Sequence, residues 1–522
     1  MLNRALTRVR QIGAMSKTAT RHSAAYEHGL TLSAQGRHLE AIEQFESALG
    51  ERPDDPHVLF ALGNTARALD MARPAEEFYR RVLAQDPGRL EALINLANLL
   101  RAEGQSEAAK ALLLPALARD PDSAELWLTL GSIYRETGNA ERAQSHYREA
   151  LTRRTDYPAA LANLADMLSD AGNSAEALEL YNRAIRREPK NAQARLNRAI
   201  LHLQAGELKE GWRDYAARVH VPGKVPVAEH KIARWTGGSL KRTRLLVTAE
   251  QGIGDQLMFA GMIPELAARA AAEGGSVVLE CEPRLQSLFA RSFPGVTVHP
   301  WDIDTRGGGM RARYGWLKAA GGANAAIEMG SLPKLMRGTL DSFPKQNAFL
   351  KPDTMENVLW AGFLASAGNG PFIGLCWRSG KTGGHRAVQY APLEAWAAFI
   401  ARLPGTLLSV QYDAPDAEIE ALERMSGRTI FVPPGLDQKI ELDRTAAMLS
   451  SLDAVVSAPT AVSWLAAGAG VDTYKILYDN SWTSFGQSYE PFGPACLCMM
   501  PQTRGDWADT FDKTLSLITA RL

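Results

Sequence analysis

The chain has 522 residues, too many for one hydrophobic core, so we expect about two to four domains. Its 58 Lys and Arg residues balance 58 Asp and Glu residues, and this neutral composition gives no reason to expect a nucleic-acid partner. Four cysteines are too few for a disulfide scaffold and favour a cytoplasmic location, and no apolar run reaches the length of a membrane-spanning helix.

Residues 1–21 form a basic segment that carries Lys and Arg side chains and no acid. A transit peptide and a membrane-surface helix are two interpretations of this pattern. A frayed basic tail is the third, and the one that we favour.

From residue 22 to residue 219 the sequence repeats with a period of 34 residues. Each repeat places a small residue where two helices approach, a large apolar residue where they interlock, and in most repeats a proline at the turn. This is the pattern of the tetratricopeptide repeat (TPR), and it predicts an α-solenoid of five full repeats and a degenerate sixth. The columns are Ala41, Ala75, Ala109, Ala143 and Ala177; Gly29, Gly63, Ala97, Gly131 and Ala165; and Phe45, Tyr79, Leu113, Tyr147 and Tyr181.

The concave face of a TPR array commonly holds an extended peptide or a partner protein. Asn95, Asn163 and Asn197 occupy one repeat position, so we expect them on one face, where they can bind the backbone of a protein acceptor. Polar residues on a solvated helix are the alternative interpretation of the same column.

Residues 220–243 are rich in proline and glycine and read as a linker. Beyond it, strand-like and helix-like runs alternate, which favours parallel sheets covered by helices. We predict two α/β halves, residues 244–365 and residues 366–522. The predicted strands are residues 245–248, 277–281, 372–377, 407–411, 429–432, 454–457 and 474–477.

The stretch from Glu250 to Asp255 joins the first predicted strand to a helix. Gly252 and Gly254 allow a sharp turn and leave room for a substrate at the carboxyl end of the strand. A carboxylate held there can remove a proton from an acceptor hydroxyl, so Asp255 and Glu250 are candidate catalytic residues. Capping of the helix is the alternative role for Asp255.

A polar loop with Arg378, Ser379 and Lys381 follows the strand at 372–377. Its glycine spacing excludes a Walker phosphate loop, but cations at a strand end can neutralise a departing phosphate without a metal. A solvated surface loop is the alternative interpretation.

The turn from Ser457 to Thr460 precedes an alanine-rich helix, whose free amides form an anion site. Capping by Ser457 is compatible with that role. Asp302-Ile303-Asp304 resembles the metal-binding Asp-X-Asp element of one class of glycosyltransferase, but we interpret it as a loop and predict no metal site.

From Gly211 to the carboxyl end, the order of motifs resembles bacterial TPR-fused proteins whose catalytic region is related to the heptosyltransferases, glycosyltransferases of the GT-B fold. The resemblance implies two Rossmann-like halves, Asp255 as the base, and a nucleotide-sugar donor on the second half near Arg378 to Lys381, Gln411, and Ser457 to Thr460. The matching motifs are Gly211-Trp212 with Tyr215, Trp235, Glu250 to Asp255, Ser331-Leu332-Pro333, Gly374 to Trp377, Ser409-Val410-Gln411, Thr445-Ala446-Ala447, Leu465 to Gly468 and Gly505-Asp506-Trp507.

Two further comparisons bear on function. The asparagine column is similar to that of O-linked N-acetylglucosamine transferase, and the layout resembles enzymes that glycosylate flagellin. Relatives carry Asp-Thr at the second turn and His within the following helix, whereas this chain has Pro459-Thr460 and Trp464.

The sequence therefore predicts a cytoplasmic, inverting, metal-independent glycosyltransferase without a cofactor. It would move a sugar from a nucleotide-sugar donor to Ser or Thr hydroxyls of a protein acceptor held by the TPR array, flagellin being one candidate. An inactive TPR and GT-B scaffold, which the altered second turn favours, and a transferase acting on a lipid or polysaccharide remain as alternatives.

Overall fold

The computed structural model describes residues 23–306, 309–345, 348–380, 389–413 and 415–522. Lys381 and the basic segment 1–21 therefore lie outside the described residues. The chain divides into two compact units, Met1–Lys190 and Asn191–Leu522. No helix in the described ranges combines the length and the apolar character that crossing a bilayer requires.

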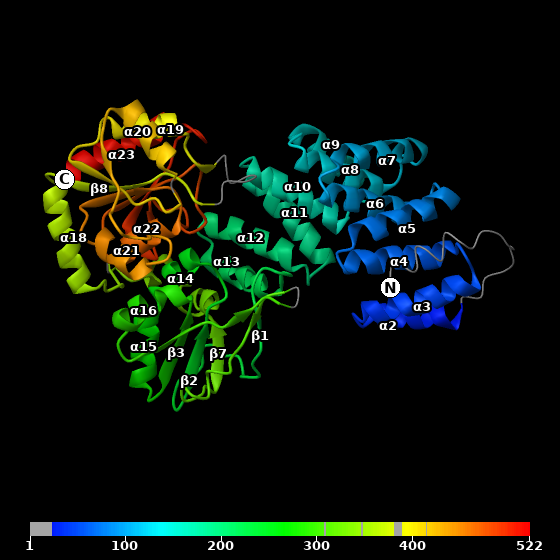
Figure 1. The fold of residues 1–522 in the computed structure, drawn as a ribbon, viewed down its shortest axis with the longest axis horizontal. Helices are drawn as coiled ribbons and strands as arrows, with labels where there is room; N and C mark the ends of the chain where they lie inside the picture. Colours follow the sequence, from blue (N-terminus) through cyan, green and yellow to red (C-terminus); the bar gives the residue numbers. More distant parts are fainter. Residues whose placement is uncertain (1–22, 307–308, 346–347, 381–388, 414) are drawn as a thin grey trace. The chain divides into compact units, whose positions relative to one another are not determined.

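The first unit is a stack of helix pairs with the predicted TPR period, drawn from blue to cyan in Figure 1. Each repeat contributes two antiparallel helices. The helices are α2 (Ala24–Ala34), α3 (His38–Glu51), α4 (Pro56–Ala68), α5 (Ala72–Gln85), α6 (Leu90–Ala102), α7 (Ser106–Arg119), α8 (Ala124–Glu136), α9 (Ala140–Arg153), α10 (Pro158–Asp170) and α11 (Ser174–Arg187).

Close approach within each pair explains the small-residue column. A Cβ atom built on Gly63 would lie 2.6 Å from the ring of Tyr79, and one built on Gly131 would lie 2.7 Å from the ring of Tyr147. Both distances are too short for a side chain, so the aromatic ring of the second helix packs directly on the backbone of the first. The helical solenoid predicted from the repeat columns is confirmed.

The second unit begins with a sixth helix pair, α12 (Ala192–Gln204) and α13 (Leu208–Tyr215). Trp212 on α13 is buried, and its ring makes edge contacts with Phe259, Phe485 and Phe492 of the α/β region. Its indole N–H donates to the carbonyl of Arg337 at 2.9 Å. The last repeat is thus part of the core of the second unit.

The first parallel sheet has the order β4-β3-β2-β7. Its strands are β2 (Arg244–Thr248), β3 (Ser276–Cys281), β4 (Thr297–Pro300) and β7 (Ala325–Glu328). Helices α14 (Ile253–Ala260), α15 (Ile263–Ala272) and α16 (Gln286–Ser292) connect them. Because the apolar runs are buried on both faces, β2 and β3 read as continuous hydrophobic segments in the sequence.

The second sheet has seven strands in the order β10-β9-β8-β11-β12-β14-β13, all parallel except the edge strand β13. Numbered among themselves in chain order, its six parallel strands follow the 3-2-1-4-5-6 order of a doubly wound sheet. The strands are β8 (Phe372–Cys376), β9 (Thr406–Ser409), β10 (Ile430–Phe431), β11 (Ala454–Ser457), β12 (Thr473–Ile476), β13 (Tyr489–Glu490) and β14 (Gly493–Met499). The helices are α18 (Thr354–Ala367), α19 (Leu393–Ile400), α20 (Asp416–Ser426), α21 (Leu442–Leu449), α22 (Ala461–Gly468) and α23 (Trp507–Arg521). The predicted parallel sheets are therefore present.

A third, three-stranded sheet differs from the prediction at two places. Its strands are β1 (Val227–Ala228), β6 (Arg311–Ala312) and β5 (Ile303–Asp304), in the order β1-β6-β5. The segment expected to be a linker supplies β1, and the backbone N–H of Trp235 in the same segment donates to Ala326 on β7. The Asp302 to Asp304 stretch is not a plain loop, because β5 occupies part of it and Asp304 forms ion pairs with Arg306 and Arg313.

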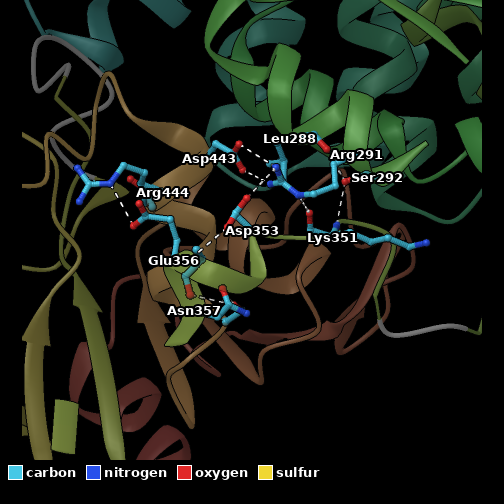
Figure 2. A network of polar contacts seen from close by, with 12 residues as sticks. Leu288, Arg291, Ser292, Lys351, Asp353, Glu356, Asn357, Asp443 and Arg444 are labelled. Carbon is cyan, nitrogen blue, oxygen red and sulfur yellow. Dashed lines mark hydrogen bonds and ion pairs between the residues drawn. The ribbon is translucent and has the colours of Figure 1, made fainter. Parts of the chain in front are cut away.

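Polar contacts join the two larger sheets near the start of α18, as Figure 2 shows. Arg291, at the end of α16, pairs with Asp443 on α21, and its Nε atom donates to the carbonyl of Lys351 at 2.7 Å. The Lys351 N–H in turn donates to Ser292 Oγ at 2.8 Å. On the other side, Arg444 and Glu356 pair α21 with α18 at 3.2 Å. One arginine thus ties the first half to the second at their junction.

Candidate functional site

A cavity of about 590 Å³ lies between the two α/β halves at the carboxyl ends of their strands. Crevices at this edge of parallel sheets are the usual ligand sites of such folds. The walls come from the loop after β2, the loop after β8 and the start of α22. Lining residues include Gly252, Ile253, Gly254, Leu257, Glu282, Arg284, Trp301, Ser379, Gly380, Tyr412, Asp413, Gln438, Lys439, Leu442, Thr445, Ala461, Val462 and Leu465.

Two cations line this cavity, and each has an acidic partner. Arg284 contacts Glu282 at 2.7 Å, and Lys439 contacts Asp413 at 2.9 Å. Arg284 also donates to the main-chain carbonyl of Lys439 at 2.7 Å, so it links the first half to the second across the cavity wall. Among the described lining residues, both of these cations therefore already have an acidic partner.

Asp255 lies in the first turn of α14 and keeps partial access to solvent. Gly252 is the N-cap of this helix, so the alternative role of Asp255 as the N-cap residue is wrong. Burial, followed by the charge of nearby Glu250, raises the pKa of Asp255 to about 6, while Lys224 and Arg218 oppose the rise. Asp255 is not itself a lining residue, but a Cβ atom built on cavity-lining Gly252 would lie 3.8 Å from Asp255 Oδ2, so the carboxylate is next to a residue of the cavity wall.

Glu250 is held in a buried network. Its Oε1 atom accepts from the Nη2 atom of Arg218 at 2.6 Å and from the backbone N–H of Gly330 at 3.1 Å. Arg218 is 1% exposed and also donates to Ser331 at 3.0 Å. With these partners Glu250 holds the loop in place, and its charge raises the pKa of Asp255. The assignment of Glu250 as a catalytic residue stays a prediction.

The two loop glycines are not needed for the backbone conformation. Gly252 has a φ of −66°, and Gly254 lies within α14. Side chains at Gly254 would instead approach Ala461 and Trp464 of α22, at 3.8 Å from a built Cβ atom. The expected sharp turn is therefore a helix start, and the value of both glycines is the space that they leave in the cavity.

The loop after β8 is fixed by Gln411. Its Oε1 atom accepts from the backbone N–H groups of Trp377 and Arg378, both at 2.9 Å, and its Nε2 atom donates to the carbonyls of Arg378 and Tyr412. The Arg378 guanidinium pairs with Glu418 at 2.7 Å. Of the predicted donor-binding residues in this region, Ser379 lines the cavity, whereas Gln411 and Arg378 support the loop that presents it.

At the second turn the N-cap of α22 is Thr460, whose side chain accepts from the Val462 N–H at 3.3 Å. The expected cap, Ser457, is fully buried at the end of β11 and donates instead to the Ala458 carbonyl at 2.7 Å. Capping by Ser457 is therefore wrong. Ala461 and Val462, the first residues of α22, line the cavity. The N-terminus of this helix, which carries a partial positive charge, therefore lies at the cavity wall.

Behind α22, Trp464 packs under a buried cation. The Nζ atom of Lys475 lies 4.0 Å from the centre of the Trp464 ring and 2.6 Å from Glu490. Both charged side chains are buried, Lys475 at 2% and Glu490 at 0% exposure. The tryptophan thus occupies the face of α22 that adjoins Gly254, and the ion pair holds it there.

The asparagine column of the repeats takes part in contacts between neighbouring repeats. Asn95 Nδ2 donates to Asn64 Oδ1 at 2.8 Å, and Tyr79 donates to the same oxygen at 2.7 Å. Asn163 makes the corresponding contact with Ser132 at 3.5 Å. Asn197 lies on α12 of the second unit and accepts from Gln193. Peptide binding by these amides stays a prediction.

Sequence reasoning missed most of the cavity wall and all partners of Glu250. Glu282 and Arg284 follow β3, and Tyr412 and Asp413 follow β9, so the strand-end rule that singled out Asp255 would also have found them. Arg218 carries no local signal, because its partner lies 32 residues away. In the described part of the chain, no group of three His, Cys, Asp or Glu side chains converges as a metal site would require.

Glu280 on β3 gives a pH-dependent prediction. It is fully buried, accepts from the Ala249 N–H at 3.0 Å, and burial raises its pKa to about 7. A carboxyl group with a raised folded pKa stabilises the fold below its unfolded pKa of about 4.5, and this contribution is lost as the pH rises towards 7. We expect Glu280→Gln to flatten the fall in melting temperature between about pH 5 and about pH 8. The Glu229→Gln variant, which changes an exposed glutamate, should keep the same fall in melting temperature as wild type. Equal pH profiles for wild type and Glu280→Gln would contradict the raised pKa of Glu280.

Comparison with known proteins agrees with the repeat architecture. Tetratricopeptide-repeat family models match residues 26–89, 59–133, 122–190 and 162–219. The chain is 31% identical over 319 residues to Protein FlbA of Caulobacter vibrioides, which is 60% of this chain and 53% of that protein. The chain therefore spans about half the length of this relative.

Similar solved structures each cover part of this chain. TTC0263, a TPR protein of Thermus thermophilus, is 29% identical with a TM-score of 0.31, over 35% of this chain and 100% of that one. PilF of Pseudomonas aeruginosa is 20% identical with a TM-score of 0.32, over 38% of this chain and 88% of that one. The chain is a TPR-containing protein, with helical repeats followed by parallel α/β sheets.

Proposed function

We propose that this protein is a GT-B glycosyltransferase that moves a sugar from a nucleotide-sugar donor to a Ser or Thr hydroxyl of a protein acceptor. The observation that carries the proposal is the cavity of about 590 Å³ between two parallel sheets, with Asp255 beside its wall and the start of α22 in its wall. A transferase of this kind needs a base, an anion site and a space that can exclude water, and Asp255, the start of α22 and the cavity are our candidates for these three parts.

The proposed reaction assigns one task to each wall. Asp255 takes the proton of the acceptor hydroxyl, whose oxygen attacks the anomeric carbon from the face opposite the leaving group. The bond from that carbon to the phosphate oxygen breaks, and the nucleotide leaves with the electron pair. Amides at the start of α22, with Arg284 and Lys439, stabilise the phosphate charge, so no metal is required.

Intact-mass spectrometry of secreted and surface proteins, flagellin first, tests this proposal in cells with and without the gene. We expect one protein to lose a sugar-sized mass on deletion and to regain it on complementation. Unchanged masses for all candidate proteins would contradict protein glycosylation. A lipid or polysaccharide acceptor would show instead as a change in the extracted glycans.

A second candidate function is an inactive scaffold, and Trp464 is the observation that favours it. The indole lies on the side of α22 next to Gly254. The enzymes that the sequence resembles commonly carry a smaller histidine in this helix. Calorimetric titration with a panel of nucleotide sugars separates the two candidates. A saturable signal with one donor supports the enzyme, and the lack of any signal across the panel supports the scaffold.

A further inference from the structure

The outer side of helix α18 carries no charged side chain. Figure 1 shows this helix at the edge of the second unit. Its charged residue Glu356 turns inward and pairs with Arg444 at 3.2 Å, and Asn357 contacts Ser450 behind α21 at 3.2 Å. We call the outward-facing set the α18 face. Its exposed residues are Thr354, Met355, Val358, Leu359, Ala361, Gly362, Ala365 and Ser366.

The α18 face is continuous and strongly apolar. At 3.6 residues per turn its members fall within one arc of about 160° around the helix. Met355, Val358 and Leu359 are 73%, 68% and 65% exposed. The Ser366 hydroxyl donates to the Phe363 carbonyl at 2.7 Å, so its hydrogen bond is made within the helix. A solvated helix normally places charged residues on this side, and an uncharged apolar face indicates an interaction surface.

The charges of α18 do not suit a lipid surface. The helix contains no Lys or Arg, whereas helices that lie on anionic membranes are rich in both. The charged groups at its start, Asp353 and Glu356, are acidic and would be repelled by anionic lipids.

The α18 face is complementary in shape to itself. Its large side chains, Met355, Val358 and Leu359, lie in the first half of the helix, and the second half offers only small residues. A Cβ atom built on Gly362 would meet nothing within 4 Å, so the helix is open to a neighbour there. In an antiparallel pair related by a two-fold axis, the large half of each helix packs on the small half of the other. Val358 then lies opposite Gly362, and Met355 lies opposite Ser366.

We infer that the α18 face binds the α18 face of a second copy of this chain as an antiparallel, two-fold pair. This contact is independent of the proposed transfer reaction. The helix has 14 residues. It is therefore about 21 Å long and about 10 Å wide, and two such faces bury roughly 400–800 Å², less than the about 1,200 Å² of stable interfaces. The dimer is accordingly weak and depends on protein concentration.

Sedimentation velocity of the full chain from about 1 μM to about 500 μM, a range that covers weak dimers, tests the inference. Gly362→Leu enlarges the small half and should block Val358, although it adds apolar surface. Leu359→Lys places two like charges beside the two-fold axis. Gly50→Leu and Met425→Lys are the matched controls, because Gly50 is an exposed helical glycine with nothing within 4 Å of a built Cβ atom and Met425 is 44% exposed on α20.

We expect the sedimentation coefficient of wild type and both controls to rise with concentration. The dissociation constant of Gly362→Leu and of Leu359→Lys should increase about 10-fold or more at an unchanged melting temperature. Stronger association of Gly362→Leu would show unspecific apolar contact and overturn the inference, as would a wild type that stays monomeric. Wild type that binds phosphatidylcholine vesicles without self-association would assign the face to lipid and also overturn it.

Discussion

Replacing Asp255 with Asn is expected to lower sugar transfer by about 10²-fold to 10⁴-fold, the range that a positioned general base contributes. Asparagine keeps the size of the side chain but cannot accept the acceptor proton. The fold should persist, because α14 is capped at Gly252 and not by Asp255. The initial rate of transfer, compared with the melting temperature of the same preparation, checks both statements.

The pH profile gives an independent signature of the same base. Since the pKa of Asp255 is raised to about 6, transfer by wild type should fall as the pH drops through that value and the carboxylate becomes protonated. The exposed Asp302 offers a matched control, because Asp302→Asn makes the same chemical change away from α14. Full transfer activity in Asp255→Asn would exclude this residue as the base.

The second large effect is expected on stability. Arg218→Met leaves Glu250 buried without its cation, and breaking a buried ion pair by removing one partner costs about 3–5 kcal/mol. Hydrogen exchange of peptides that contain residues 215–256 should accelerate strongly, because that is where the network holds the loop to Gly330 and Ser331. The double variant Arg218→Met with Glu250→Leu should recover most of the protection, since no unpaired charge remains.

Arg234→Met is the control for this stability effect. The Arg234 side chain is 49% exposed, so its pair with Glu328 should contribute no more than about 1 kcal/mol. Comparable exchange in Arg218→Met and wild type would show that the buried pair does not organise the loop.

The sequence was informative where one local pattern sets the structure. The strand at 245–248, the strand at 454–457 and the repeat helices were predicted because continuous apolar runs and fixed periods reflect burial directly. The two-residue strand β1 was missed, since its pairing partner β6 lies more than eighty residues away and a proline-rich segment resembles a linker. β14 was missed as well, because Gly493 and Pro494 at its start read as turn residues.

The candidate site shows the same division. Asp255, Ser379 and Thr460 were identified from their places at strand ends, and all three lie at or beside the large cavity. Which of the candidate residues line the cavity and which support its loops was not predictable from the sequence, because this depends on contacts between distant segments. Gln411 supports a loop through four backbone contacts, and Arg378 pairs with Glu418 forty residues away.

The aromatic contacts of Trp212 have a consequence for how such proteins can be varied. Helices α12 and α13 belong to the core of the second unit. The boundary between the repeats that could be exchanged and the α/β unit that must stay intact therefore falls at Asn191, before the repeat pattern ends. Repeats that precede Asn191 belong to the other compact unit and contribute no ring to the contacts of Trp212 with Phe259, Phe485 and Phe492. A graft joined after Tyr215 would remove Trp212 and leave Phe259, Phe485 and Phe492 open to solvent.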